Sequence, residues 1–204
     1  MLAFRRGHGP GNPADGQDWR QFVREKQGLL VLLDRIQDPQ NLGSIVRSAE
    51  ALGARAVFLT GQGAPPGDTM HRVSSGASLR LPIFALSNLH RLVQQLKDDG
   101  YWICAAADPE ALASQKDGAH SAKPGKGDAK HSQSVACTHS ELQKLPEARE
   151  LALIIGNEGA GIKPLVLRES DYVISITMAG QTPSLNAGVA AGILLDRLIH
   201  RDAK

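Results

Sequence analysis

The feature that most constrains this sequence is a short apolar run that ends in a glycine-rich turn. Residues Leu151 to Ile155 are all apolar, and Gly156, Gly159 and Gly161 lie in the turn that follows. A run this short and this apolar, ended by glycines, is typical of a strand buried on both faces of a parallel sheet. In open α/β sheets, ligands bind just beyond the carboxyl ends of such strands. The turn is therefore predicted to carry a ligand site.

The same turn contains one carboxylate, Glu158. A charge at this position needs a partner or water, and the glycines around it let the backbone approach a ligand closely. Two common nucleotide motifs do not match. Residues 156–161 read G-x-x-G-x-G instead of G-x-G-x-x-G, and no glycine loop in the chain ends in G-K-[ST]. The sequence thus disfavours nicotinamide dinucleotide and nucleoside triphosphate sites.

Apolar runs alternate with segments of helical spacing along most of the chain. This alternation predicts an α/β fold with a mainly parallel sheet flanked by helices. The expected strands cover 29–33, 54–60, 81–84, 101–106, 151–155 and 172–178. The expected helices cover 18–27, 41–52, 69–80, 88–99, 164–170 and 187–200.

The second of these helices has a polar face that is open near its start. Asn41 is predicted to be its N-cap, and Gly53 is a natural stop. Arg47 lies off the apolar stripe, one turn after Gly43 and Ser44, so a ligand has room to approach it.

Two stretches are predicted to lie outside the compact core. Residues 1–27 are expected to form a flexible leader or linker with a short helix, because glycine, proline and polar residues dominate its first part. Residues 114–134 are rich in Lys, Gly, Ser, Ala and His without apolar periodicity, which predicts a mobile insertion. His120, His131 and His139 lack the spacing of metal ligands, so no metal is expected.

Composition sets only broad limits. A chain of 204 residues can bury a hydrophobic core without disulfides or structural metal ions. Its formal net charge of +2 permits nucleic-acid binding but is not evidence for it. Cys104 and Cys137 are the only cysteines, which favours a reducing compartment over a disulfide framework. No apolar run is long enough to span a bilayer and no signal peptide is apparent, so a cytoplasmic location is expected.

Three segments, taken together, resemble one family. Asp38–Gly53, Ile155–Ile162 and Ile176–Ala190 are similar, in this order, to three motifs of the SpoU (TrmH-type) RNA ribose 2′-O-methyltransferases of the SPOUT superfamily. Val73–Ser78 is similar to a further shared stretch and favours the branch that methylates guanosine in 23S rRNA over the tRNA branch. The resemblance covers roughly residues 29–202. Any one of the motifs alone would be a weak signal.

The resemblance implies a fold and a reaction. It implies a methyltransferase domain over residues 28–204 with a deep C-terminal trefoil knot, a rare exception to unknotted topology. It also implies S-adenosyl-L-methionine bound in a bent form, RNA as substrate, with rRNA favoured over tRNA, and a homodimer with the active site at the interface. Thr177 departs from the family, which usually has proline there, and so does Ala187-Gly188, where Val-Ser is common. Too few residues precede the first motif for the N-terminal RNA-binding domain that many relatives carry.

The resemblance also implies the site residues. Because a guanidinium is nearly always protonated, Arg47 is expected to clamp a phosphate and stabilise a developing alkoxide instead of acting as a base. Glu158 and Asn41 are expected to orient Arg47 or the reacting hydroxyl, and Ser184 and Asn186 to cap the last helix and order the cofactor loop. The implied catalytic residues are Asn41, Arg47, Glu158, Ser184 and Asn186. The implied cofactor-binding residues are Gly156, Asn157, Gly161, Ile176, Met178, Leu185 and Asn186.

Each of these residues also has an ordinary structural interpretation. Asn41 alone would be read as an N-cap, Arg47 as a surface cation and Glu158 as a partner of Lys163; only their joint occurrence in three motifs favours the functional interpretation. Three other functions remain open: a tRNA ribose 2′-O-methyltransferase, a catalytically silent RNA-binding or ribosome-assembly protein with the same fold, and a SPOUT enzyme that acts on a base nitrogen. Asn41 and Arg47 favour the ribose over the base.

Deletion of Gly118–Lys130 is expected to leave the fold intact, because this stretch has no apolar periodicity with which to contribute to a core. Soluble yield and the cooperativity of thermal unfolding measure the outcome. An insoluble product would show that the insertion is structural.

Overall fold

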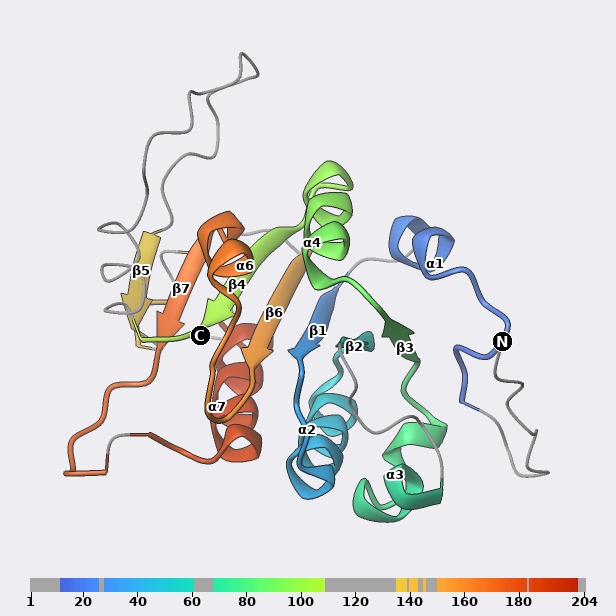
Figure 1. The fold of residues 1–204 in the computed structure, drawn as a ribbon, viewed down its shortest axis with the longest axis horizontal. Helices are drawn as coiled ribbons and strands as arrows, with labels where there is room; N and C mark the ends of the chain where they lie inside the picture. The colour runs from blue at the N-terminus through green and yellow to red at the C-terminus, as the bar shows by residue number, and fades with distance from the viewer. Residues whose placement is uncertain are drawn as a thin grey trace.

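The computed structural model describes residues 12–25, 28–60, 68–108, 135–138, 140–142, 145, 150–182 and 184–201. In this part of the chain, seven parallel strands form one sheet in the order β3-β2-β1-β6-β4-β7-β5 (Figure 1). The strands are β1 (Leu29–Asp34), β2 (Ala56–Thr60), β3 (Ile83–Leu86), β4 (Trp102–Ala106), β5 (Val135–Thr138), β6 (Leu151–Gly156) and β7 (Tyr172–Ser175). The helices are α1 (Trp19–Glu25), α2 (Pro39–Leu52), α3 (Asp68–Val73), the 3₁₀ turn η1 (Ala77–Leu79), α4 (Leu89–Asp98), α6 (Pro164–Glu169) and α7 (Ala187–Ile199).

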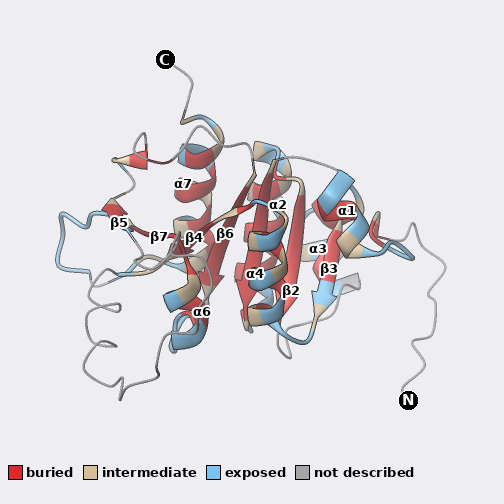
Figure 2. Ribbon diagram, turned by 90° about the horizontal axis from the view of Figure 1, so that it is seen from above, coloured by how far each residue is buried: buried red, intermediate tan, exposed pale blue. Residues whose placement is uncertain are grey.

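Helices cover both faces of the sheet, which is why its central strands are apolar throughout. All six residues of β1 are buried, and its five apolar residues alternate between two hydrophobic cores. Leu29, Val31 and Leu33 contribute to the core shared with α2 and α7, whereas Leu30 and Leu32 contribute to the core shared with α1, α4 and α6. The buried strands lie between these two helical layers in Figure 2. The predicted α/β fold with a parallel sheet is confirmed.

Several predicted boundaries differ from the structure. The second helix begins at Pro39, and its N-cap is Asp38, whose carboxylate accepts a hydrogen bond from Gln40 N at 3.0 Å. The prediction that Asn41 is the N-cap is therefore wrong, since Asn41 already lies within the first helical turn. The last strand ends at Ser175 instead of 178. The edge strand β5 was not predicted, because its four residues follow a polar stretch and show no clear period.

The start of the described chain packs against the domain. Asn12 is buried and donates from Nδ2 to the carbonyls of Ser78 and Leu81, at 2.8 and 3.2 Å, while its Oδ1 accepts from Ile83 N at 2.9 Å. Phe22 of α1 is buried in the hydrophobic core that α1 shares with α4. Residues 12–25 therefore pack against the domain, and α1 lies within the stretch where a short helix was expected. The expected insertion at 114–134 lies outside the described residues.

None of the helices in the described part of the chain is long and apolar enough to cross a membrane. Within the same ranges, no group of three or more His, Cys, Asp or Glu side chains is placed to hold a metal ion. Both cysteines are buried, and neither forms a disulfide. Burial raises the pKa of the Cys104 thiol far above its ordinary value.

The two helices of one layer, α2 and α7, touch at a glycine. A Cβ on Gly188 would lie 1.9 Å from Ser44 Oγ, which real contacts do not allow. A Cβ on Gly192, one turn further along α7, would meet Ser48 Oγ at an ordinary 3.7 Å. The close approach of α7 to α2 therefore depends on Gly188 and not on the number of glycines in the helix.

Gly188→Ala is expected to destabilise the protein by about 1–3 kcal/mol through overpacking, and Ser44→Ala in the same chain should recover part of this loss. Gly192→Ala is the matched control and should stabilise α7 by up to about 1 kcal/mol, because alanine is the better helix former. Urea unfolding measures both. Equal effects of the two substitutions would contradict a specific contact at Gly188.

Candidate functional site

All strands are parallel, so the carboxyl ends of β1, β6 and β7 lie at the same end of the sheet, the carboxyl edge (Figure 1). Gly156 ends β6 and lies beside Asp34, the last residue of β1. A Cβ on Gly156 would lie 2.4 Å from the carbonyl carbon of Gly161 and 2.5 Å from Ile162 N. The chain after β6 thus folds back onto the strand end so tightly that only glycine fits at position 156.

Asn157 holds this turn together from within. Its Oδ1 accepts from Gly159 N at 2.9 Å and from Ala160 N at 3.0 Å, and its carbonyl accepts from Gly161 N at 2.9 Å. Gly161 has a φ of +63°, which glycine adopts without steric cost. Asn157 and Gly161, both predicted as cofactor-binding residues, therefore shape the turn that carries Glu158.

Three residues from three distant segments form one hydrogen-bonded line. Asn41 donates from Nδ2 to Glu158 Oε1 at 2.7 Å. Asn186 donates from Nδ2 to Asn41 Oδ1 at 2.7 Å. Asn41 is 6% exposed, so its amide is withdrawn from water and its two bonds fix its orientation. The line brings together one residue from each of the three segments that resembled family motifs, as predicted.

Asn186 also caps α7. Its Oδ1 accepts from Gly188 N at 2.9 Å and from Val189 N at 3.3 Å, which satisfies two of the free N–H groups at the start of that helix. The predicted capping role is confirmed for Asn186. Ser184 lies two residues before it, is exposed and is not the cap. One side chain thus couples the start of α7 to α2 and, through Asn41, to Glu158.

Arg47 lies away from this line. It follows Asn41 by six residues in α2, which corresponds to a rise of about 9 Å and a rotation of about 240° around the helix axis. Its Nη1 donates to Ser75 Oγ at 3.2 Å, and its side chain is exposed. Among the described residues of one chain, the hydrogen-bond partner of the Arg47 side chain is Ser75. That Glu158 and Asn41 orient Arg47 or the reacting hydroxyl therefore stays a prediction.

Ser75 belongs to the stretch Val73–Ser78 and has a left-handed φ of +52°. The residues around it are tied together below the surface. Ser74 Oγ donates to Ser78 Oγ at 3.1 Å, and His71 Nδ1 lies 2.7 Å from the same Ser78 oxygen. Both serines are fully buried. The turn is thus held by internal hydroxyl contacts in a form that presents Ser75 to Arg47.

The remaining predicted residues lie in the segment that joins β7 to α7 at the same edge of the sheet (Figure 1). Residues 176–179 are outside the helices and strands. Ile176 and Leu185 are half-buried, and Met178 is 36% exposed, which is unusual for so large an apolar side chain. Apolar side chains and loop backbone are therefore available next to the line of polar residues.

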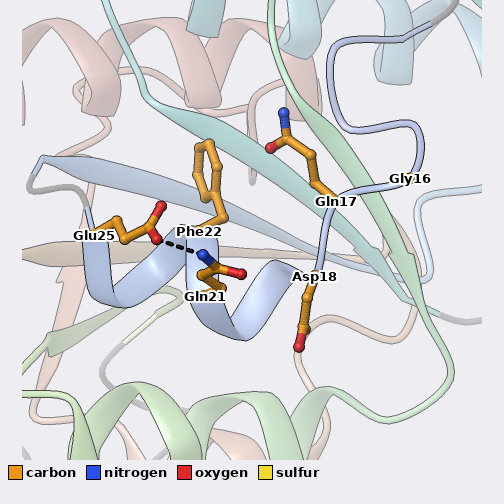
Figure 3. A pocket seen from close by; sticks show the side chains of 6 residues that line it. All are labelled: Gly16, Gln17, Asp18, Gln21, Phe22 and Glu25. Carbon is orange, nitrogen blue, oxygen red and sulfur yellow. Dashed lines mark hydrogen bonds between the residues drawn. The ribbon is translucent and has the colours of Figure 1, made fainter.

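A hollow in the protein surface lies apart from this edge. It has a volume of about 330 Å³ and lies beside α1 (Figure 3). Phe22 is its one apolar side chain, and the Gln21 amide donates to Glu25 Oε1 at 2.6 Å at its border. Its lining shares no residue with the predicted site and consists of Gly16, Gln17, Asp18, Gln21, Phe22 and Glu25. Nothing in its chemistry points to a particular ligand.

Burial shifts the pKa values of several side chains that lie away from the candidate site. Burial raises the pKa of Tyr101 and lowers the pKa of Arg55, which donates to the Tyr101 hydroxyl at 2.8 Å. Burial also raises the pKa of Tyr172 at the start of β7. These groups lie within the packing of α1 and at the amino ends of β4 and β7, so their shifts report on the core and not on the candidate site.

Comparison with known proteins places this geometry in a family. The family model described as the SpoU rRNA Methylase family matches residues 28–196. This chain belongs to that family. Its sequence is 31% identical over 202 residues to a provisionally named TrmH family tRNA/rRNA methyltransferase of Staphylococcus aureus, which covers 93% of this chain and 67% of the relative. It is 34% identical to an uncharacterized tRNA/rRNA methyltransferase of Synechocystis, over 85% of this chain and 38% of the relative.

Solved structures of family members share the fold. The SpoU methyltransferase AviRb from Streptomyces viridochromogenes, solved in complex with AdoMet, is 26% identical with a TM-score of 0.64; the match covers 87% of this chain and 58% of that one. The A. aeolicus TrmH/SpoU tRNA modifying enzyme is 22% identical with a TM-score of 0.64, over 90% of this chain and 82% of that one, and shows the fold alone. This chain thus spans only part of the length of several relatives that it matches.

Sequence reasoning missed three residues of this edge. Asp34 and Arg35 contact the turn after β6, and Ser75 contacts Arg47. Asp34 had a detectable signal, since a charged residue directly after an apolar strand is unusual in a core and needs a partner. Arg35 and Ser75 had none, because a left-handed φ at a residue other than glycine cannot be read from the sequence.

Asn41→Ala and Asn186→Ala are expected to be coupled by about 0.5–3 kcal/mol in a double-mutant cycle of unfolding free energies, because their side chains share a hydrogen bond. Asn88, the N-cap of α4 on the other face of the sheet, supplies the control. Asn41→Ala and Asn88→Ala should be additive within about 0.5 kcal/mol. Additivity of both pairs would contradict the line of hydrogen bonds.

Proposed function

We propose that this chain is an S-adenosyl-L-methionine-dependent RNA methyltransferase that acts on a ribose 2′-hydroxyl, with a guanosine in ribosomal RNA as the target. One observation carries the proposal. The hydrogen-bonded line Glu158–Asn41–Asn186 joins the three family motifs at the edge of the sheet where ligands of α/β proteins bind.

The residues at this edge suit the proposed cofactor. Met178, Ile176 and Leu185 offer partly exposed apolar surface for an adenine ring, and the loop backbone of 176–179 offers peptide groups outside any helix or strand. Glu158 supplies a carboxylate at a site that would receive a positively charged ligand. Gly156, Asn157 and Gly161 keep the turn compact enough for that ligand to approach the strand ends.

The bound cofactor would supply an electrophilic methyl group on a sulfonium. Transfer would form a bond between the ribose oxygen and the methyl carbon as the bond between sulfur and that carbon breaks, and the hydroxyl proton would leave to solvent or a neighbouring base. The protein's own contribution is positioning. Asn41, itself held by Asn186, orients Glu158. The exposed guanidinium of Arg47 would bind a phosphate of the RNA and stabilise negative charge on the oxygen.

The separation of Arg47 from the line supports the proposal of a homodimer. Within one chain, Arg47 and Asn41 point to different sides of α2, so one copy alone does not place the guanidinium over the cofactor loop. A second copy, with its own loop facing Arg47, would complete the site. The C-terminal trefoil knot and the cytoplasmic location expected from the sequence stay predictions.

The RNA is proposed to be ribosomal because Val73–Ser78 is similar to a stretch of the rRNA branch and because the same stretch contacts Arg47. The names of the relatives include both tRNA and rRNA methyltransferases. Mapping of ribose methylation in RNA from cells with and without the protein distinguishes the two. A lost methyl group in tRNA would replace the rRNA assignment.

Arg47→Ala is expected to lower methyl transfer to RNA by 100-fold or more, on the order of 3 kcal/mol of transition-state stabilisation, and to leave the affinity for S-adenosylmethionine nearly unchanged. Arg91→Ala is the control, because Arg91 is exposed on α4 at the other face of the sheet. Transfer of a labelled methyl group and calorimetry with S-adenosylmethionine measure the two effects.

Two outcomes would overturn parts of the proposal. Loss of cofactor binding in Arg47→Ala would contradict the role given to this residue. Failure of the folded wild-type protein to bind S-adenosylmethionine at high protein concentration would favour a silent RNA-binding protein of the same fold.

A further inference from the structure

Two residues outside the turn after β6 also hold it in place. They are Asp34, the last residue of β1, and Arg35, the next residue in the chain. Asp34 is the last residue of β1 and is 1% exposed. A buried carboxylate is costly unless it is paired and hydrogen-bonded. The family motifs quoted from the sequence account for neither Asp34 nor its neighbour Arg35, so the reason for a buried charge at this point must lie in its contacts.

Asp34 contacts both its neighbour and the far end of the turn. Its Oδ1 accepts from Arg35 Nε at 3.1 Å, and its Oδ2 accepts from Arg35 Nη2 at 3.1 Å, which makes a two-pronged ion pair. The same Oδ2 accepts from Lys163 N at 3.1 Å. Lys163 is where the turn ends and α6 begins. The buried carboxylate therefore fixes the exit of the turn.

Arg35 contacts the middle of the turn. Its Nη2 donates to the Gly161 carbonyl at 3.2 Å, and its own carbonyl accepts from Asn157 Nδ2 at 3.0 Å. Its φ of +58° is left-handed, a conformation that L-residues other than Asn and Asp rarely adopt. This backbone geometry directs the chain out of β1 while the guanidinium and the carbonyl both reach the same turn.

We propose that Asp34 and Arg35 form a clamp that positions the glycine turn 156–163 and so determines how well the turn binds the cofactor. The inference rests on the proposed function for its last step only. Neither residue is proposed to touch the reacting atoms; both act through the turn. The clamp contacts Asn157, Gly161 and Lys163, on both sides of Glu158, so it restricts the turn at its start, its middle and its end.

The clamp explains why the turn can be rich in glycine and still have one shape. Glycines at positions 156, 159 and 161 permit many backbone conformations. The contacts within the turn come from Asn157 alone, whereas the contacts from Asp34 and Arg35 attach it to the sheet. Without this attachment the turn would keep its local hydrogen bonds and the bond between Glu158 and Asn41, but it would lose its direct hydrogen bonds to the end of β1.

Two variants distinguish loss of the clamp contacts from a general loss of folding stability. Arg35→Gly removes the guanidinium and suits a left-handed backbone, so the fold should be retained. Asp34→Asn keeps the shape of the side chain and removes the charge. Arg80→Ala is the control, because Arg80 forms a similar two-pronged pair with Glu50 on the surface at 2.6 and 3.1 Å, away from the turn.

Amide hydrogen exchange of the full chain without cofactor tests the clamp directly. Exchange at the amides of residues 159–163 should become about tenfold faster or more in Arg35→Gly and Asp34→Asn, as expected for loss of hydrogen bonds to charged groups. Exchange in β4 should not change, and Arg80→Ala should leave the turn as it is. Unchanged exchange at 159–163 in Arg35→Gly would overturn the proposal, whatever the result for Asp34→Asn.

The affinity and activity of the same variants test the link to the cofactor. In Arg35→Gly the KM for S-adenosylmethionine should rise about tenfold while the KM for RNA changes less than about twofold, and Arg35→Lys should recover part of the loss, since lysine keeps the charge without the fork. Faster exchange with an unchanged KM would contradict the effect of the clamp on the cofactor. A wild-type protein that does not bind the cofactor would refute the proposed function, and the exchange data would still decide whether the clamp holds the turn.

Discussion

The close packing of α7 against α2 is the contact on which the rest of the candidate site depends. Gly188 lies directly over Ser44, and a Cβ at position 188 would clash with Ser44 Oγ unless that side chain moved. This contact places the start of α7 next to the start of α2, so Asn186 can cap one helix and donate to Asn41 of the other. Asn41 in turn reaches Glu158. A shift of α7 by the width of one methyl group would break this line at its first bond.

The two sides of the line are supported in different ways. On the α7 side, support is steric and comes from apolar burial of the helix, whose residues Ala191, Leu194, Leu195 and Leu198 are part of the core under the sheet. On the Glu158 side, support is polar, because a glycine turn has few side chains to pack. Asn157 folds the turn, and Asp34 and Arg35 attach it to the sheet. Directional bonds thus replace packing where side chains are missing.

The separation of Arg47 from Asn41 has a physical consequence for the proposed reaction. The same helix carries the residue that orients the turn and the residue proposed to bind RNA, on different sides. Ser75, with its left-handed backbone, holds the guanidinium in place from the opposite direction. In the proposed assembly of two copies, both sides of α2 would serve one site.

The order and type of most elements followed from the sequence by itself, because apolar runs at Leu29–Leu33 and Leu151–Ile155 and helical spacing from Leu42 to Leu52 report burial directly. Motif resemblance also identified Asn41, Glu158 and Asn186 as residues of one site. Only the tertiary structure decided how they meet: which atoms bond, that Asp38 and not Asn41 caps α2, that Arg47 contacts Ser75, and that Asp34 and Arg35 hold the turn. The bonds of Asn41 and the contacts of Asp34 and Arg35 with the turn join segments more than one hundred residues apart. The contact between Arg47 and Ser75 depends on the left-handed backbone at Ser75. Neither long-range contacts nor left-handed backbone leave a periodic trace in the sequence.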